Sequence, residues 1–205
     1  MAAVDGAQVS VSRDAAFAFT APFEGFVPHL YRDSYGIVTW AYGNAGTLAS
    51  AMLLPWQHQD GSRCQPDEVV QDWKSAQAAP VGHAAGWYAR LMRLRLPEAA
   101  GRALFGDRVD EFNAALDREF PGFDGFPDPA QLGTFDMLFN CGMGTLRAKF
   151  PSWHAAVAEK DWLGAAANCH RVNPHPGVTP WDSSDEHERR QIAVRDLYQQ
   201  AARAA

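Results

Sequence analysis

The sequence predicts an α+β fold, in which a small N-terminal sheet is joined to a larger helical body. Residues 31 to 48 are rich in Gly, Tyr, Thr, Val and Trp, a composition typical of short strands joined by tight turns. Most of the later sequence instead places apolar residues at helical spacing. Because 47% of the residues are hydrophobic and 20% are charged, the chain is able to form a sizeable core. We therefore expect one domain, with a sheet lobe at residues 1 to 60 and a helical lobe at residues 61 to 205.

The N-terminal third is expected to run from a short helix into the strands. Ser12 is suited to cap this helix, and Pro22 weakens its end. Gly-rich turns then separate the short strands of residues 31 to 48. Residues 55 to 66 have the polar, Gly- and Pro-containing composition of a loop.

Helices are expected to dominate from Pro66 onward. Pro66 and the two acidic residues after it are typical of a helix start. A second helix is predicted over residues 84 to 96, and a third begins after Asp107 as its N-cap. Residues 121 to 129 interrupt the pattern before a strongly apolar helix that ends near Gly142. Shorter helices are predicted at residues 153 to 159 and 161 to 170, and a Pro-rich loop at 173 to 180 precedes a last helix at about 185 to 202.

Composition excludes several classes of partner. The formal net charge is −6, and no run of Lys or Arg resembles a nucleic-acid patch. No apolar stretch reaches the roughly 18 residues that a membrane span requires. The N-terminus shows no basic segment followed by an apolar one, so we expect a protein made in the cytoplasm without a signal peptide. An extracytoplasmic substrate would then require a separate delivery route.

The cysteines predict neither disulfides nor a metal centre. Cys64, Cys141 and Cys169 form an odd, sparse set, and Cys141 lies in an apolar stretch that suits a small core residue. Cys169 and His170, taken with His175, match no established zinc spacing. We therefore expect no metal and no organic cofactor.

Two carboxylates near the helix–strand junction form a pair suited to glycosidic bond hydrolysis. Such hydrolysis requires a proton for the leaving oxygen and a carboxylate that activates water or attacks the sugar. Glu24 ends an apolar run, where partial burial would keep it protonated as an acid. Asp33 lies in a wetter, Gly-rich turn, and the hydroxyl of Thr39 is placed to hold a water against it. Taken alone the pair is weak evidence, because a helix-end Glu and a turn-forming Asp are common.

The pattern around the pair resembles the phage-T4-type lysozyme family, glycoside hydrolase family 24. That family has a Glu-Gly at the end of a short helix, then a Tyr, a basic residue and an Asp, then a Gly and a Thr that opens a Gly-punctuated strand. The spacing from Glu24 to Gly43 matches this motif without a gap. The matching residues are Glu24-Gly25, Tyr31-Arg32-Asp33, Gly36, Thr39 and Gly43. The resemblance implies a lysozyme-like fold and carries the family's acid, catalytic Asp and Thr onto Glu24, Asp33 and Thr39.

Two later segments are similar to the family more loosely. Residues 135 to 144 resemble the family's buried helix, which ends in Phe-Asn/Gln-x-Gly, and this makes Asn140 a candidate substrate contact. Family members often carry an Arg on the last helix that pairs with the catalytic Glu. Arg189 or Arg190 is expected to orient Glu24 in this way, the alternative being a solvated helix face.

The hairpin departs from the family at two positions. Ala41 replaces a Gly, which is tolerable if the residue has β conformation. Asn44 replaces a His whose role in the family is largely structural. Neither change affects the proposed acid, base or hydroxyl.

The resemblance implies an inverting muramidase that cleaves the β-1,4 bond between N-acetylmuramic acid and N-acetylglucosamine in bacterial peptidoglycan. Tyr31, Trp40 and Tyr42 are candidates for stacking on sugars, although core packing is the more natural role for at least one of them. Two other functions stay open, namely a glycan- or partner-binding module that does not cut and a chitinase-like glycanase. The protein would reach its substrate either as an endolysin released through a holin, or as an antibacterial effector of a contact-dependent secretion machine such as type VI. An effector would have a cognate immunity protein as a partner.

Overall fold

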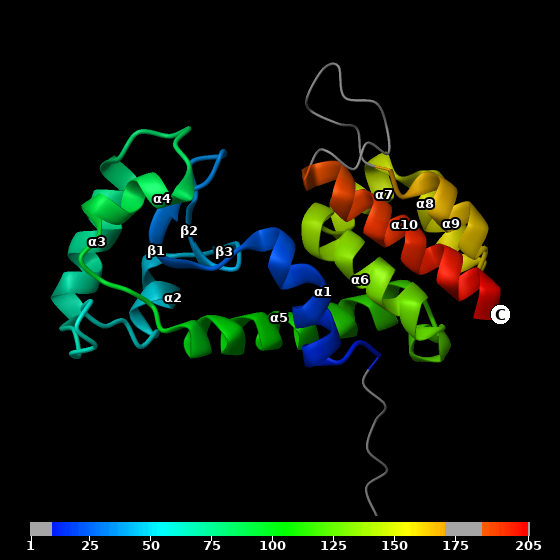
Figure 1. Cartoon of the computed structure of the whole chain (residues 1–205), viewed down its shortest axis with the longest axis horizontal. Coiled ribbons are helices and arrows are strands. Elements are labelled where there is room, and N and C mark those ends of the chain that lie inside the picture. Colours follow the sequence, from blue (N-terminus) through cyan, green and yellow to red (C-terminus); the bar gives the residue numbers. More distant parts are fainter. Residues whose placement is uncertain (1–9, 171–185, 205) are drawn as a thin grey trace, which may run out of the picture. The chain divides into compact units, whose positions relative to one another are not determined.

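The computed structural model describes residues 10–170 and 186–204 and has the predicted α+β class (Figure 1). The chain divides into two compact units. The first, here called the sheet unit, is Glu24–Asp107, and the second, the helical unit, combines Met1–Phe23 with Arg108–Ala205. The sheet unit thus extends to residue 107, beyond the expected lobe boundary at residue 60.

The sheet has three antiparallel strands in the order β1-β2-β3. These are β1 (Val27–Arg32), β2 (Val38–Ala41) and β3 (Asn44–Ala45). All four residues of the central strand, β2, are buried, so this strand forms part of the core of the unit. Leu30 of β1 is also buried, with 2% of its surface exposed. Strands β2 and β3 lie within the segment predicted from composition, whereas β1 begins four residues before it and only overlaps its start.

Short helices and extended loops complete the sheet unit. The helical segments are α2 (Leu48–Met52), α3 (Pro66–Ala78), α4 (Ala85–Tyr88) and a 3-10 turn (Ala89–Leu91). The helix predicted over residues 84 to 96 is thus wrong in its second half. There the buried carboxylate of Asp72 accepts the backbone N–H groups of Arg93 and Leu94, each at 2.9 Å. Arg95 exchanges backbone hydrogen bonds with Gln57, and these contacts hold the segment extended.

The prediction that Asp107 caps a helix is also wrong. Helix α5 runs over Glu98–Glu119, so Asp107 lies inside it. Pro97 precedes the true start, and its carbonyl accepts the N–H groups of Ala100 and Gly101. Large apolar residues follow a clear helical spacing only after residue 108, because the first turns of α5 are rich in the small residues Ala and Gly. The boundary between the two units falls within α5.

Helix α1 (Arg13–Glu24) begins where the sequence predicts and is tied into the helical unit. The Oγ of Ser12 accepts the N–H of Ala15 at 3.1 Å, which confirms the predicted cap. Farther along, Thr20 donates its hydroxyl to the buried carboxylate of Asp136 at 2.9 Å. The guanidinium of Arg190 donates to both oxygens of that carboxylate, at 2.9 and 3.0 Å.

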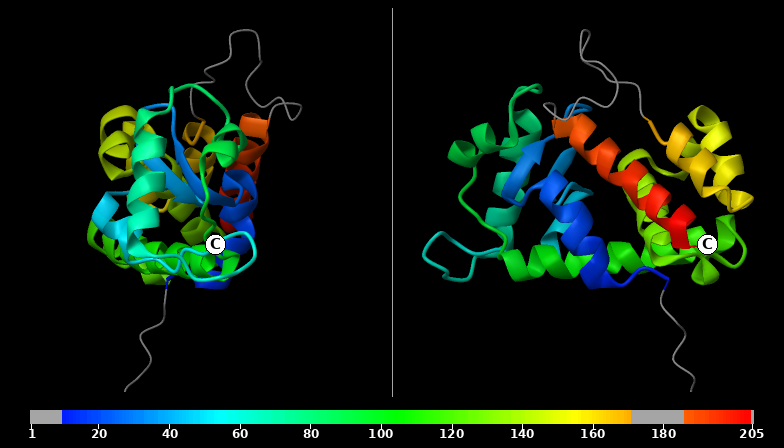
Figure 2. Two further views of the ribbon diagram at one scale, coloured as in Figure 1. Left: turned by 90° about the vertical axis from the view of Figure 1, so that its left-hand side faces the viewer. Right: turned by 45° about the vertical axis from the view of Figure 1, so that its right-hand side comes forward.

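The remaining helices of this unit include α10, drawn in orange to red in Figure 2. The helices are α6 (Asp128–Cys141), α7 (Met143–Lys149), α8 (Pro151–Ala158), α9 (Trp162–Asn168) and α10 (Glu186–Ala204). Helix α10 contacts both α6 and α9. In the core, the hydroxyl of Tyr198 lies 3.0 Å from the Thr134 hydroxyl and accepts the indole N–H of Trp153 at 3.0 Å. The predicted loop at residues 173 to 180 lies outside the described residues.

A charged cluster in the helical unit makes its stability depend on pH. Glu119 accepts two hydrogen bonds from Arg147 and lies 2.6 Å from Nε2 of His154, and these partners lower the pKa of its carboxyl from 4.5 to about 2. A lowered pKa contributes stability above pH 4.5 that is lost as the pH falls toward 2. Since Arg147 is largely exposed, solvent screening keeps this contribution small.

The variant Glu119→Gln tests this contribution. Chemical denaturation at several pH values should show wild type more stable than the variant above pH 4.5, with the difference shrinking toward pH 2. A difference that stays constant over this range would mean that Glu119 acts through packing rather than charge.

Candidate active site

The Asp33 carboxylate organises the turn between β1 and β2. Its Oδ1 atom accepts the N–H groups of Tyr35 at 2.9 Å and Ile37 at 2.8 Å. Its backbone carbonyl accepts the N–H of Gly36 at 3.0 Å, where a φ of +80° favours glycine. Within the described part of the chain, no hydrogen bond reaches Oδ2. Asp33 thus uses one oxygen to build the turn.

Strand pairing places the candidate groups on one face of the hairpin. Tyr31 lies directly opposite Thr39, and the N–H of Asp33 donates to the carbonyl of Ile37 at 3.0 Å, which extends the pairing by one residue. Opposed residues and residues two apart along a strand share a face. Tyr31, Asp33 and Thr39 therefore leave the hairpin on the same side.

Thr39 supports the turn in this structure. Its side chain is 2% exposed, and its hydroxyl donates to the carbonyl of Ile37 at 3.1 Å. Because the hydrogen is used in this way, the oxygen is left to act only as an acceptor toward a water. The predicted role of Thr39 in holding a water against Asp33 stays a prediction.

Glu24 lies at the C-terminal end of α1, half-buried beside the turn that follows β2. Gly43 in that turn has a φ of +71°, and a Cβ atom added to it would lie 3.3 Å from Oε2 of Glu24. The missing side chain therefore leaves room for the carboxylate. At the end of β2, Ala41 adopts a φ of +51°, so the β conformation under which the replacement of Gly would be tolerable is not met. A left-handed alanine costs roughly 1 to 2 kcal/mol, which the buried surroundings of Ala41 must offset.

The charges of both carboxylates affect the phenol of Tyr31. Burial raises the pKa of its hydroxyl from 10 to about 12, and the negative charges of Asp33 and then Glu24 add to the increase. All three groups belong to the sheet unit. Glu24 and Asp33, which are nine residues apart in sequence, thus both lie within electrostatic range of the Tyr31 hydroxyl.

Two of the predicted sugar-stacking residues belong to the core instead. Trp40 is 3% exposed and packs edge-on against Trp73, with the ring centroids 6.4 Å apart. Tyr42 is 4% exposed and contacts the rings of Phe26 and Phe105. Neither offers a ring face to a sugar, and this corrects the expectation for both. Both faces of β2 are buried, and neighbouring aromatic rings cover Trp40 and Tyr42, while Tyr31 is only half-buried and stays a candidate.

Asn140, Arg189 and Arg190 belong to the helical unit. Asn140 is exposed near the end of α6, and Arg189 is exposed on α10. Arg190 is 5% exposed and bonded to Asp136, with its guanidinium 5.5 Å from the ring centre of Phe23. The predicted roles of Asn140 as a substrate contact and of the arginines as partners of Glu24 stay predictions.

The described residues contain no group of three or more His, Cys, Asp or Glu side chains placed to hold a metal ion. Cys169 is buried and Cys141 half-buried, while His170 lies 3.3 Å from Glu188. His175 lies outside the described residues. Within residues 10–170 and 186–204, no helix has the length and apolar character to cross a membrane.

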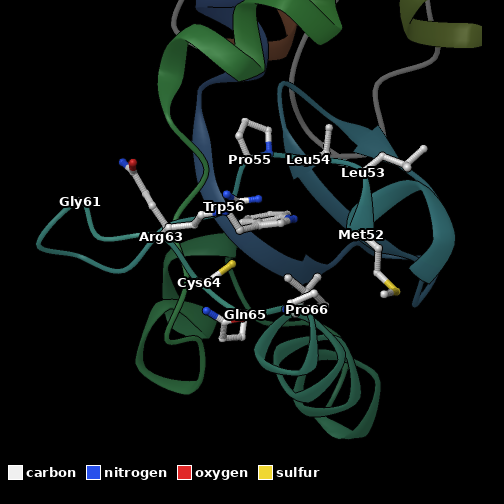
Figure 3. Close-up of a pocket in the computed structure, with 12 residues that line it drawn as sticks. Met52, Leu53, Leu54, Pro55, Trp56, Gly61, Arg63, Cys64, Gln65 and Pro66 are labelled. Carbon is white, nitrogen blue, oxygen red and sulfur yellow. The ribbon is translucent and has the colours of Figure 1, made fainter.

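A separate pocket of about 810 Å³ lies in the sheet unit, between the end of α2 and the start of α3. Figure 3 shows Met52 and Leu53 on one side of Trp56 and Arg63 on the other. None of the residues predicted to act in catalysis or binding lines this pocket.

A comparison with protein-family models gives no match, and a comparison with curated proteins gives none either. The case for a function therefore rests on the residues themselves. Arg32 belongs to the motif between Tyr31 and Asp33, but the sequence alone assigned it no role. Its side chain donates to three backbone carbonyls, which only the folded structure reveals.

The Tyr31 environment predicts a titration that does not depend on any activity. Asp33→Asn should lower the pKa of Tyr31 from about 12, and Glu24→Gln should lower it by a smaller amount, because each variant removes a negative charge near the phenol. NMR of ring-labelled tyrosine, assigned with Tyr31→Phe, measures the change. Asp60→Asn is the matched control, since Asp60 also accepts a turn N–H, from Ser62. An unchanged pKa of Tyr31 in both Asp33→Asn and Glu24→Gln would contradict the proximity of Tyr31 to the two carboxylates.

Proposed function

We propose that this protein is a glycoside hydrolase that cleaves the β-1,4 bond between N-acetylmuramic acid and N-acetylglucosamine in bacterial peptidoglycan. The observation that carries the proposal is geometric: two backbone amides bind Oδ1 of Asp33, and Glu24 of the same unit lies beside Gly43 at the end of α1. Hydrolysis of a glycoside requires two carboxyl groups that differ in setting. Glu24 is held at a helix end beside Gly43, whereas Asp33 lies in a turn with one oxygen bound by backbone amides.

In the proposed reaction, Glu24 donates a proton to the glycosidic oxygen as the bond to the anomeric carbon breaks. The Oδ2 atom of Asp33 removes a proton from a water that attacks the same carbon from the opposite side. Glu24 leaves the reaction ionised and Asp33 protonated, and exchange with solvent restores both. A single displacement inverts the anomeric configuration, and it requires carboxyl groups about 6.5 to 9.5 Å apart.

The choice of substrate rests on the resemblance of the Glu24–Gly43 segment to the phage-T4-type lysozymes. Tyr31 is the remaining aromatic candidate for contact with a sugar, and Asn140 and the α10 arginines are proposed to contribute as in that family. Delivery to the cell wall would use a holin or a contact-dependent secretion machine, and a secreted effector would have an immunity protein as a partner.

Digestion of purified peptidoglycan tests the proposal. Wild type should release fragments with reducing-end muramic acid, detected by mass spectrometry, while Glu24→Gln and Asp33→Asn should each lower kcat by about 10² to 10⁴-fold. Asp60→Asn should cut like wild type. Folded wild type that binds peptidoglycan without cutting it would support a binding module, and selective cutting of chitin would support a chitinase-like glycanase.

Gly43 provides a second prediction. Gly43→Ala should cost about 1 kcal/mol in stability and also lower kcat, because its Cβ would press on the Glu24 carboxylate. Gly61→Ala is the matched control, since Gly61 has a φ of +83° but nothing lies within 4 Å of an added Cβ. Thermal denaturation should show similar losses for both variants, and only Gly43→Ala should lose activity. Equal activity in the two variants would mean that Gly43 does not shape the acid site.

A further inference from the structure

Arg32 binds three backbone carbonyls with one guanidinium group. Its Nε donates to Gly36 at 3.0 Å, while its Nη1 donates to Gln77 at 3.1 Å and Ala79 at 2.9 Å. The first carbonyl belongs to the turn that carries Asp33, and the other two belong to the end of α3. One side chain thus joins the turn to a helix more than forty residues away in sequence.

The end of α3 gives this cation a favourable partner. The last carbonyls of a helix have no partner within the helix, and they lie at the negative end of its dipole. The final turn of α3 contains no basic residue of its own, so Arg32 supplies the positive charge from the hairpin. A planar guanidinium can serve several carbonyls at once, which an ammonium does less well.

Gly36 makes the contact sterically possible. A Cβ atom on Gly36 would lie 2.7 Å from Nη2 of Arg32, so the absent side chain provides the space that the guanidinium uses. Because neighbouring strand residues face opposite sides, Arg32 reaches α3 from the face of the hairpin opposite to Tyr31 and Asp33. Arg32 therefore holds the turn without entering the side that carries the carboxylates.

We propose that Arg32 is a positioning residue for the Asp33 carboxylate. By fixing the turn against the end of α3, it holds Oδ2 of Asp33 at a constant place relative to the other groups of the sheet unit. This inference rests on the proposed glycosidase function for its effect on rate, but the positioning itself is a property of the turn. Misplacement of a catalytic group by about 1 Å is enough to lower the reaction rate by a factor on the order of 100.

Arg95 provides a matched control. Its guanidinium also donates to three carbonyls of the sheet unit, those of Met92 at 3.0 Å, Leu94 at 2.7 Å and Ala89 at 3.1 Å. None of these belongs to the Asp33 turn. Arg95→Ala therefore removes the same kind of contact without releasing that turn.

The experiment compares Arg32→Ala, Arg32→Lys and Arg95→Ala with wild type. On peptidoglycan, Arg32→Ala should lower kcat by about 10- to 100-fold with little change in KM. Arg32→Lys should fall between Arg32→Ala and wild type, and Arg95→Ala should keep the wild-type kcat. Amide hydrogen exchange should show reduced protection of the Tyr35 and Ile37 N–H groups in Arg32→Ala but not in Arg95→Ala.

The two readouts separate the two claims. If wild type cuts and Arg32→Ala loses no more kcat than Arg95→Ala, positioning by Arg32 is overturned while the glycosidase function stands. If wild type does not cut, the glycosidase function fails, and the exchange of the Tyr35 and Ile37 amides still decides whether Arg32 fixes the turn. Wild-type protection in Arg32→Ala overturns the inference in either case.

Discussion

The pairing of β1 with β2 is the constraint on which the candidate site depends. It sets Tyr31 opposite Thr39 and leaves a tight turn in which the Asp33 carboxylate satisfies two backbone N–H groups. A shift of one residue in this register would move Tyr31 and Thr39 to the other face of the sheet. The buried strand β2 and the contact of Arg32 with α3 both oppose such a shift. The chemistry proposed for Asp33 therefore depends on backbone geometry as much as on the carboxylate.

The two carboxylates differ in how the chain holds them. Asp33 is bound by amides of its own turn, which fix one of its oxygens, and the other is the oxygen proposed to activate water. Glu24 is held from outside, by the helix that ends at it and by the space that Gly43 leaves. Tyr31 lies within electrostatic range of both, and its phenol is able to donate a hydrogen bond. This asymmetry is what a division into acid and base requires.

The sequence was informative where local chemistry decides the structure. Ser12 capped its helix, Gly142 ended α6 with a φ of +71°, and the composition of residues 31 to 48 indicated strands. It failed where distant contacts decide. Asp72 holds residues 93 and 94 extended against a helical pattern, and no local signal predicts that partner.

The candidate site shows the same division between local and distant effects. Glu24, Asp33 and Thr39 were predictable because a spaced motif carries them. Core packing decided the burial of Trp40 and Tyr42, since in a small sheet even turn residues are covered by neighbouring aromatic rings. The left-handed backbone of Ala41 also depends on the folded structure, because the strands on both sides fix the geometry of the turn between β2 and β3. The partners of Arg32 lie in α3 and in the turn and could not be inferred from its neighbours in sequence.

The central claim is that Glu24 and Asp33 act together on one glycosidic bond through a water. The most direct measurement is proton NMR of the first sugar product released from a soluble peptidoglycan fragment, recorded before the anomers equilibrate. The account predicts that the new reducing end appears first as the α-anomer, because water attacks a β-linked sugar from the opposite face. A first product in the β configuration would contradict it, since that outcome requires a double displacement rather than a single attack by water held at Asp33.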